Sequence, residues 1–100
     1  MTFANIGTLG TKAGAQEAVV AILTRQNHEL RDAGCLLYEV GVDDEQPNTV
    51  FVMELWTSPD AHQASLRLES VRAAITEAMP LLSGEMSGSR FEVLGSPLHA

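Results

Sequence analysis

The segment from Gly34 to Trp56 constrains this chain most, because it contains two strand-like runs that are apolar on both faces. Successive side chains of a β-strand point to opposite faces, so residues two apart share a face. In residues 50–56 one face carries Val50, Val52 and Trp56, interrupted by Glu54. The other face carries Phe51, Met53 and Leu55.

The first run of this hairpin, residues 35–42, is also rich in apolar residues. Its even-numbered row is Leu36, Tyr38, Val40 and Val42. Leu37 adds an apolar side chain to the opposite face. The acidic segment 43–48, which contains Pro47, predicts a turn between the two strands. Such a hairpin needs a cover on each of its faces.

Before the hairpin, the sequence predicts a strand and then a helix. Residues 3–9 form a short apolar run typical of a strand. From Ala15 to Ala33, apolar residues recur at spacings of three and four, which predicts one amphipathic helix. Gly34 follows as its stop signal.

After the hairpin, Ser58 and Pro59 mark the start of another helical region. Helical stretches are expected over residues 60–68 and 69–79, and Pro80 ends or kinks the second. The Ser/Gly-rich residues 83–89 predict a connection to a last short strand over residues 90–94. Residues 95–100 are expected to be a flexible tail.

The resulting order, β-α-β-β-α-β, is that of the ferredoxin-like α+β fold with an antiparallel sheet. A chain of 100 residues fits one domain, residues 1–100. In this fold the helices cover one face of the sheet, and the other face of this hairpin is apolar too. An exposed apolar patch of that size marks an interaction surface, so we expect a homodimer packed sheet against sheet.

Charge and composition exclude several classes of partner. Six basic residues stand against 13 acidic ones, and the basic residues are scattered. Phosphate backbones and anionic membranes both require concentrated positive charge, so neither nucleic acid nor a membrane is expected. The one cysteine, Cys35, excludes an intramolecular disulfide. Without a membrane-spanning or leader pattern, the expected location is the cytoplasm.

Several short motifs occur in a characteristic order along almost the whole chain. They are Lys12-Ala13-Gly14, Gly34-Cys35-Leu36, Tyr38-Glu39-Val40, Pro47, Glu54-Leu55-Trp56, Ala61-His62 and Pro80-Leu81-Leu82. With these motifs the chain resembles the antibiotic biosynthesis monooxygenase superfamily of small dimeric α+β-barrel proteins. That superfamily includes cofactor-free quinol and polyketide oxygenases, haem-degrading enzymes and members without known activity.

The resemblance implies roles for three residues. Trp56 would line the cavity between the helices and the sheet, His62 would position or deprotonate a phenolic substrate, and Arg72 would stabilise the resulting anion. Each residue also has a structural interpretation. Trp56 serves equally as a core anchor, and His62 as a solvated or capping histidine. Arg72 serves equally in a surface ion pair with Glu69 or Glu77.

Three further residues are candidates for substrate binding. Asn5 matches a polar strand residue of the superfamily, although a one-residue slip in register would turn it to the opposite face. Tyr38 faces either the cavity or the partner subunit. Ser65, like Ser70, stands where quinol-oxidising relatives carry histidines. Glu54 is interpreted as structural rather than catalytic, in an ion pair with an arginine that could come from across a dimer interface.

We therefore hypothesise a cofactor-independent monooxygenase that oxidises a planar phenol, quinol or polyketide-type substrate with O2. No metal, flavin or other cofactor is expected, because no metal or nucleotide motif is present. The alternative is a non-catalytic small-molecule-binding or accessory protein on the same fold. Haem degradation is disfavoured, because Ile75 and Ser65 stand where the haem degraders carry an axial histidine and a helical tryptophan.

Overall fold

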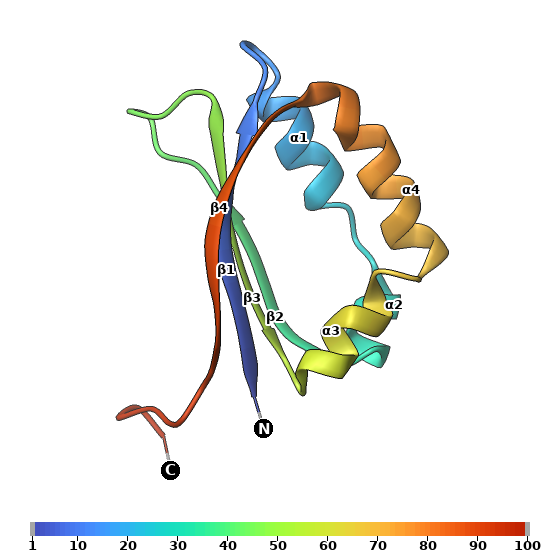
Figure 1. Cartoon of the computed structure of the whole chain (residues 1–100), viewed down its shortest axis with the longest axis vertical. Helices are drawn as coiled ribbons and strands as arrows, with labels where there is room; N and C mark the ends of the chain where they lie inside the picture. Colours follow the sequence, from blue (N-terminus) through green and yellow to red (C-terminus); the bar gives the residue numbers. More distant parts are fainter. Residues whose placement is uncertain (1, 100) are drawn as a thin grey trace.

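The four strands form one antiparallel sheet with the helices on one side of it (Figure 1). The computed structural model describes residues 2–99. Its elements are β1 (Phe3–Thr11), α1 (Gln16–Leu23), α2 (His28–Asp32), β2 (Cys35–Gly41), β3 (Thr49–Trp56), α3 (Pro59–Ser65), α4 (Glu69–Ala78), a 3-10 turn η1 (Met79–Leu81) and β4 (Leu82–Glu92). The strand order β2-β3-β1-β4 confirms the predicted ferredoxin-like fold.

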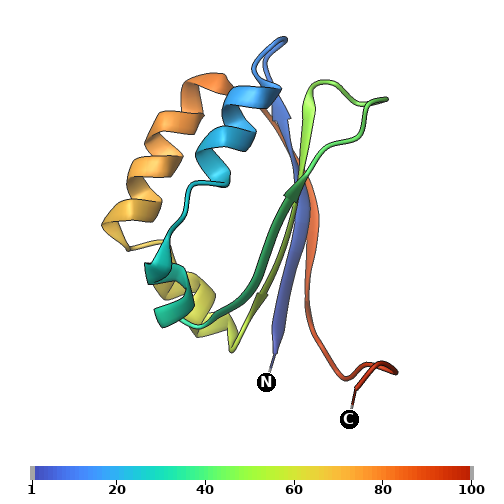
Figure 2. The ribbon, with the colours of Figure 1, turned by 180° about the vertical axis from the view of Figure 1, so that it is seen from behind.

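Both faces of β3 are apolar, as the sequence predicted. Val50 and Trp56 lie on the helix side and are fully buried, 0% and 1% exposed. Met53 lies on the outer side, opposite Ile6 of β1, and is 44% exposed. Figure 2, which views the molecule from behind, also shows the helices on one side of the sheet only. The outer face is therefore an exposed and partly apolar surface.

The helix predicted over residues 15–33 is wrong in one respect, because the structure divides it into α1 and α2. Asn27 lies at the break, and its side-chain oxygen accepts a hydrogen bond from the backbone N–H of Glu29. This bond caps the start of α2, and such capping favours a new helix over continuation of the old one. Gly34 follows α2 with φ +106°, which agrees with its predicted role as a stop.

The even-numbered row predicted for β2 holds only in its middle. Tyr38 lies opposite Glu54, and Val40 lies opposite Val52, on the helix side. The register shifts between Cys35 and Leu37, which leaves Leu36 in a bulge and 58% exposed. An extra residue in a bulge breaks the two-residue period, which the sequence pattern alone does not reveal.

The connection predicted over residues 83–89 is wrong, because these residues belong to β4, the longest strand. β4 pairs with β1 along most of its length, with Gly88 opposite Gly7. A Cβ atom built on Gly7 would lie 2.3 Å from the carbonyl oxygen of Ser87. The two backbones therefore approach closely where neither residue has a side chain, and the small residues permit a strand.

The helix side of the sheet is closed over β3 and open over β4. Helices α1 and α3 pack on β2 and β3, whereas α4 packs mainly on α1 and η1. Met86 of β4 is 73% exposed, although its register partner Leu9 places it on the helix side. No helix among residues 2–99 is long and apolar enough to cross a membrane. The tail predicted for residues 95–100 includes Ala100, which lies outside the described residues.

Candidate functional site

Four polar side chains form a row across the helix side of the sheet, one from each strand. Tyr38 of β2 lies opposite Glu54 of β3, Glu54 lies opposite Asn5 of β1, and Asn5 lies opposite Arg90 of β4. Neighbouring strands are about 4.8 Å apart, so each side chain can reach the next. We call these four residues the polar row. It connects the closed half of the sheet with its open half.

Glu54 is the buried centre of the polar row. One carboxylate oxygen accepts a hydrogen bond from Nδ2 of Asn5 at 3.0 Å, and the other accepts one from Nε1 of Trp56 at 3.0 Å. Because a buried carboxylate needs donors, these two bonds explain how Glu54 can be only 9% exposed. Within residues 2–99 an amide and an indole, rather than an arginine, donate to Glu54, and an arginine from a partner subunit stays a prediction.

His62 reaches the polar row from α3. This helix begins as predicted, with the Ser58 hydroxyl accepting a hydrogen bond from the backbone N–H of Ala61. The His62 ring is 6% exposed and lies 5.4 Å from the Trp56 ring, in an edge-on arrangement. Its Nε2 lies 3.5 Å from Nδ2 of Asn5 and 3.9 Å from a carboxylate oxygen of Glu54. The predicted residues Asn5, Trp56 and His62 are thus brought together.

The two ring nitrogens of His62 have different surroundings. Nε2 faces Asn5 and Glu54, whereas Nδ1 makes no hydrogen bond to a described residue. Yet no buried side-chain nitrogen or oxygen among these residues lacks a partner, so Nδ1 must reach the accessible surface. Because Nδ2 of Asn5 is a donor, its contact with Nε2 at 3.5 Å is a hydrogen bond only when Nε2 of the neutral ring accepts it, which puts the ring proton on Nδ1. Nε2 is then the ring nitrogen with the lone pair, and it faces the polar row.

Ser65 contributes to the position of His62 rather than to an open surface. It is 3% exposed, and its hydroxyl donates a hydrogen bond of 2.6 Å to the backbone carbonyl of His62. The side chain therefore ties the last turn of α3 to the residue that carries the imidazole. As a predicted substrate contact it stays untested, but its hydroxyl is already engaged within the helix.

Next to Asn5 and Arg90 along their strands, β1 and β4 carry no side chains on the helix side of the sheet. Gly7 and Gly88 form the next pair along β1 and β4, and exposed Met86 lies one pair further. Glycines in strands often mark a place where a ligand or another backbone approaches closely. We call the pair Gly7 and Gly88 the glycine platform. Its flat backbone surface could accommodate a planar ring next to Asn5 and Arg90.

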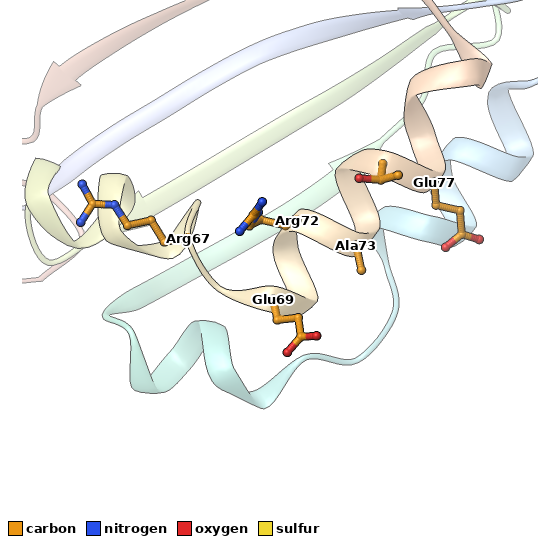
Figure 3. Close-up of a pocket in the computed structure, with 6 residues that line it drawn as sticks. Arg67, Glu69, Arg72, Ala73 and Glu77 are labelled. Atoms are coloured by element: carbon orange, nitrogen blue, oxygen red, sulfur yellow. The ribbon is translucent and has the colours of Figure 1, made fainter.

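The structure separates Arg72 from the other predicted residues. Arg72 lines a surface depression of about 680 Å³ on α4, together with Arg67, Glu69 and Glu77. In Figure 3 the guanidinium groups of Arg67 and Arg72 lie on one side of α4, and the carboxylates point to the other. Glu77, one of the two ion-pair partners considered for Arg72, instead pairs with Arg25 of the segment after α1. Neither His62 nor Trp56 lines this depression.

Tyr38 is half-buried at the β2 end of the polar row and lines a different cavity, of about 500 Å³. Burial, and then the neighbouring charge of Glu54, raise the pKa of its hydroxyl well above the ordinary value. Cys35 lies close by, and burial also raises the pKa of its thiol. A thiol with a raised pKa is a poor nucleophile at neutral pH.

Arg90 is the residue of this site that the sequence interpretation missed. It stands opposite Asn5 on the same face of the sheet, and it is exposed. Only the pairing of β1 with β4 reveals this position. Because residues 83–89 were expected to be a connection, the sequence did not define which residue of β1 lies opposite Arg90. Among residues 2–99, no group of three or more His, Cys, Asp or Glu side chains lies together to hold a metal ion.

Comparisons with known proteins show the family and the fold of this chain. The family described as antibiotic biosynthesis monooxygenase matches residues 2–77. A crystal structure of a proposed antibiotic biosynthesis monooxygenase from Chloroflexus aurantiacus is 32% identical over 99% of this chain and 100% of that one, with a TM-score of 0.81. A protein of the same proposed type from Deinococcus radiodurans is 26% identical over 96% and 95% of the two chains, with a TM-score of 0.72. Comparison with curated sequences gave no significant match.

Proposed function

The chain belongs to the antibiotic biosynthesis monooxygenase family, and from this premise we propose that it is a cofactor-independent monooxygenase. Its substrate would be a planar phenol, quinol or polyketide-type molecule that reacts with O2. The observation that supports this proposal most is the imidazole of His62, whose Nε2 lies 3.5 Å from the Asn5 amide and 3.9 Å from the Glu54 carboxylate. An anchored base of this kind is what the first step of such an oxidation requires.

The reaction would begin with transfer of a phenolic proton to Nε2 of His62, in place of the hydrogen bond from Asn5. The imidazolium that forms would lie beside Glu54, whose carboxylate is 3.9 Å from Nε2. A positioned base typically contributes about 10²–10⁴-fold to the rate of a proton-transfer step. The ring of the substrate would lie on the glycine platform, where Asn5 and Arg90 border it. Removal of the proton makes this ring electron-rich and reactive toward O2.

Such a reaction needs no external reductant, because the substrate supplies every electron. A naphthohydroquinone and O2 give a hydroxynaphthoquinone and water, so that one oxygen atom enters the ring and the other leaves as water. The first electron passes from the substrate anion to O2, and the resulting pair recombines as a hydroperoxide that loses water. The protein would supply orientation, charge stabilisation and partial exclusion of water.

Arg90 is the better placed of the two arginines to stabilise the substrate anion. A guanidinium keeps its positive charge at every relevant pH, and Arg90 adjoins Asn5 on the open half of the sheet. Arg72 lies with Arg67 in the α4 depression. We therefore propose Arg90 for this role and keep Arg72, predicted from the sequence, as the competing candidate.

The experiment is aerobic turnover of a naphthohydroquinone by metal-free protein under 18O2. We expect consumption faster than in buffer, and a product that carries one labelled oxygen. An anaerobic sample serves as the control and should show no product. If several quinols are consumed no faster than in buffer, the enzymatic proposal fails.

We also infer that two copies of the chain pack through the outer face of the sheet. Ile6 and Met53 are register partners on this face, and Phe91 of β4 lies on it too. All three are exposed, at 37%, 44% and 47%. Light scattering should give twice the chain mass of 10.7 kDa, and Met53→Lys should shift the mass toward that of one chain. A wild-type monomer would contradict this inference.

One observation favours the alternative, a non-catalytic protein that binds a small molecule. Trp56 and His62 are 1% and 6% exposed, so little of either ring is available to a substrate in this conformation. A hydrophobic metabolite that co-purifies in a stoichiometric amount and is not transformed by O2 would select this alternative. Product containing 18O would select the oxygenase.

A further inference from the structure

The break between α1 and α2 opens a cavity that lies outside the proposed reaction site. Its volume is about 500 Å³, within the range of roughly 300–1,000 Å³ that is usual for small-molecule sites. Ile22, Leu23 and Leu30 provide apolar walls, and Tyr38 and Ser70 provide hydroxyl groups. Tyr38 and Arg90 lie at opposite ends of the polar row, so this cavity and the glycine platform are separate places.

Hydrogen bonds fix the break that forms the mouth of this cavity. The hydroxyl of Thr24 donates to the carbonyl of Val20 at 2.7 Å, where α1 ends. Asn27 caps α2 with its side-chain oxygen and donates from Nδ2 to the Ser70 hydroxyl of α4 at 3.1 Å. Since Asn27 joins two helices in this way, the opening is held in place from both sides.

Tyr38 gives the cavity one polar group that is free to bind a ligand. No residue among 2–99 forms a hydrogen bond with its hydroxyl, and burial raises its pKa. The hydroxyl therefore keeps its proton and can donate a hydrogen bond at neutral pH. A ligand that satisfies it must offer an acceptor oxygen, such as that of a ketone or a hydroxyl group.

The charges around the cavity disfavour an anionic ligand. Arg25, which lines it, is engaged by Glu77 through two hydrogen bonds of 2.6 and 2.5 Å. Glu29 also lines the cavity, and Glu54 lies beside Tyr38 on the next strand. With its arginine paired and two carboxylates near, the cavity favours an uncharged molecule.

We propose that this cavity is a second ligand site, for a small uncharged aromatic molecule whose hydroxyl or ketone oxygen accepts a hydrogen bond from Tyr38. The inference depends on the cavity, its walls and the free hydroxyl of Tyr38, and it stands whether or not the glycine platform supports oxidation. Its ligand is bound as a neutral molecule, whereas the proposed substrate reacts as an anion.

The test is a titration of uniformly 15N-labelled protein with 2-naphthol, followed by amide chemical shifts. We expect saturable shifts at Asn27 and Ser70, on either side of the cavity mouth. Tyr38→Phe keeps the ring and removes the donor, so it should weaken binding by about fivefold, the effect of one neutral hydrogen bond. Leu23→Trp should abolish binding by filling the cavity. Ala73→Trp, on the exposed side of α4, is the matched control and should bind like the wild type.

The charged analogue 2-naphthoate supplies a second arm, and we expect it to bind at least tenfold more weakly than 2-naphthol. Three results would overturn the proposal: shifts confined to Gly7 and Gly88, equal affinities for the two probes, or unchanged binding in both cavity variants. The amide spectrum of each variant shows directly whether it is folded. Because binding is read without turnover, failure of the oxygenase proposal would leave this result intact.

Discussion

The two halves of the helix side of the sheet are built differently. Over β3, Val50 and Trp56 are fully buried beneath α1 and α3. Over β4, the same side of the sheet presents exposed Met86 and Arg90 and the side-chain-free Gly88. The closed half can hold a carboxylate away from water, whereas the open half can admit a ligand.

His62 and Asn5 lie at the boundary between these halves. Asn5 donates to Glu54 on the closed side and has Arg90 as its neighbour on the open side. His62 contacts both Asn5 and Glu54 through Nε2. Burial and access are thus divided: the closed half holds the carboxylate in place, and the open half is where we propose that the substrate binds.

The largest change in stability is expected from the closed half. Trp56→Ala removes a fully buried indole and leaves Glu54 without one of its donors. Large-to-small changes of this type cost about 3–5 kcal/mol of unfolding free energy. Urea denaturation measures this loss, and Leu94→Ala, at a residue 90% exposed, should change almost nothing. If Trp56→Ala lost no more unfolding free energy than Leu94→Ala, the half of the sheet over β3 would not be closed.

A smaller loss of stability is expected from the contact between β1 and β4. Gly7→Ala forces a methyl group toward the Ser87 carbonyl, and overpacking of this kind costs about 1–3 kcal/mol. Gly41→Ala is the matched control, because a Cβ atom there would have no neighbour within 4 Å. Thermal or urea unfolding of the two variants gives the comparison. Equal stabilities would mean that the strands do not approach closely at the glycine platform.

The two arginines test where the substrate anion lies. Arg90→Ala should lower kcat/KM for a naphthohydroquinone about tenfold, the effect of roughly 1.4 kcal/mol of lost charge stabilisation. Arg72→Ala should leave kcat/KM within twofold of the wild type. Steady-state oxygen consumption measures both, and Arg90→Lys should recover part of the loss. The opposite ranking would move the site to the α4 depression.

The smallest effect concerns the dependence of stability on pH at the Tyr38 end of the polar row. Its pKa is raised above the unfolded value of about 10, so the folded state holds this proton more tightly. This contribution is complete below about pH 10 and is lost as the pH rises toward the folded pKa. The wild type should therefore lose stability more steeply than Tyr38→Phe above pH 10. The Cys35 thiol is present in both proteins and affects the pH dependence of both. Parallel curves of unfolding free energy against pH would contradict the prediction.

Elements that bury apolar side chains were predictable from the sequence. The two-residue alternation of β3 predicted both of its faces, and Ser58 with Pro59 predicted the start of α3. These patterns exist because packing requires particular side chains at regular spacings. The same logic failed for β4, whose edge position and open helix side impose no apolar alternation.

The candidate site was predictable only in part, for a related reason. Asn5, Trp56 and His62 were identified, and the structure brings them together around Glu54. Arg90 and the glycine platform depend on the register between the first and the last strand, which are far apart in the sequence. At the break, Asn27 caps α2 and also donates a hydrogen bond to Ser70 of α4, and the helical pattern contains no sign of that second contact.

We propose that His62, held at the boundary of the two halves, is the base of an oxygenase. The most direct test compares kcat/KM of His62→Ala and His99→Ala for aerobic oxidation of a naphthohydroquinone by metal-free protein. His99 is an exposed histidine outside the sheet and helices, so its variant controls for loss of an imidazole. We predict that His62→Ala is at least about 100-fold slower than the His99 variant, the usual contribution of a general base. Equal rates in two folded variants would contradict the account.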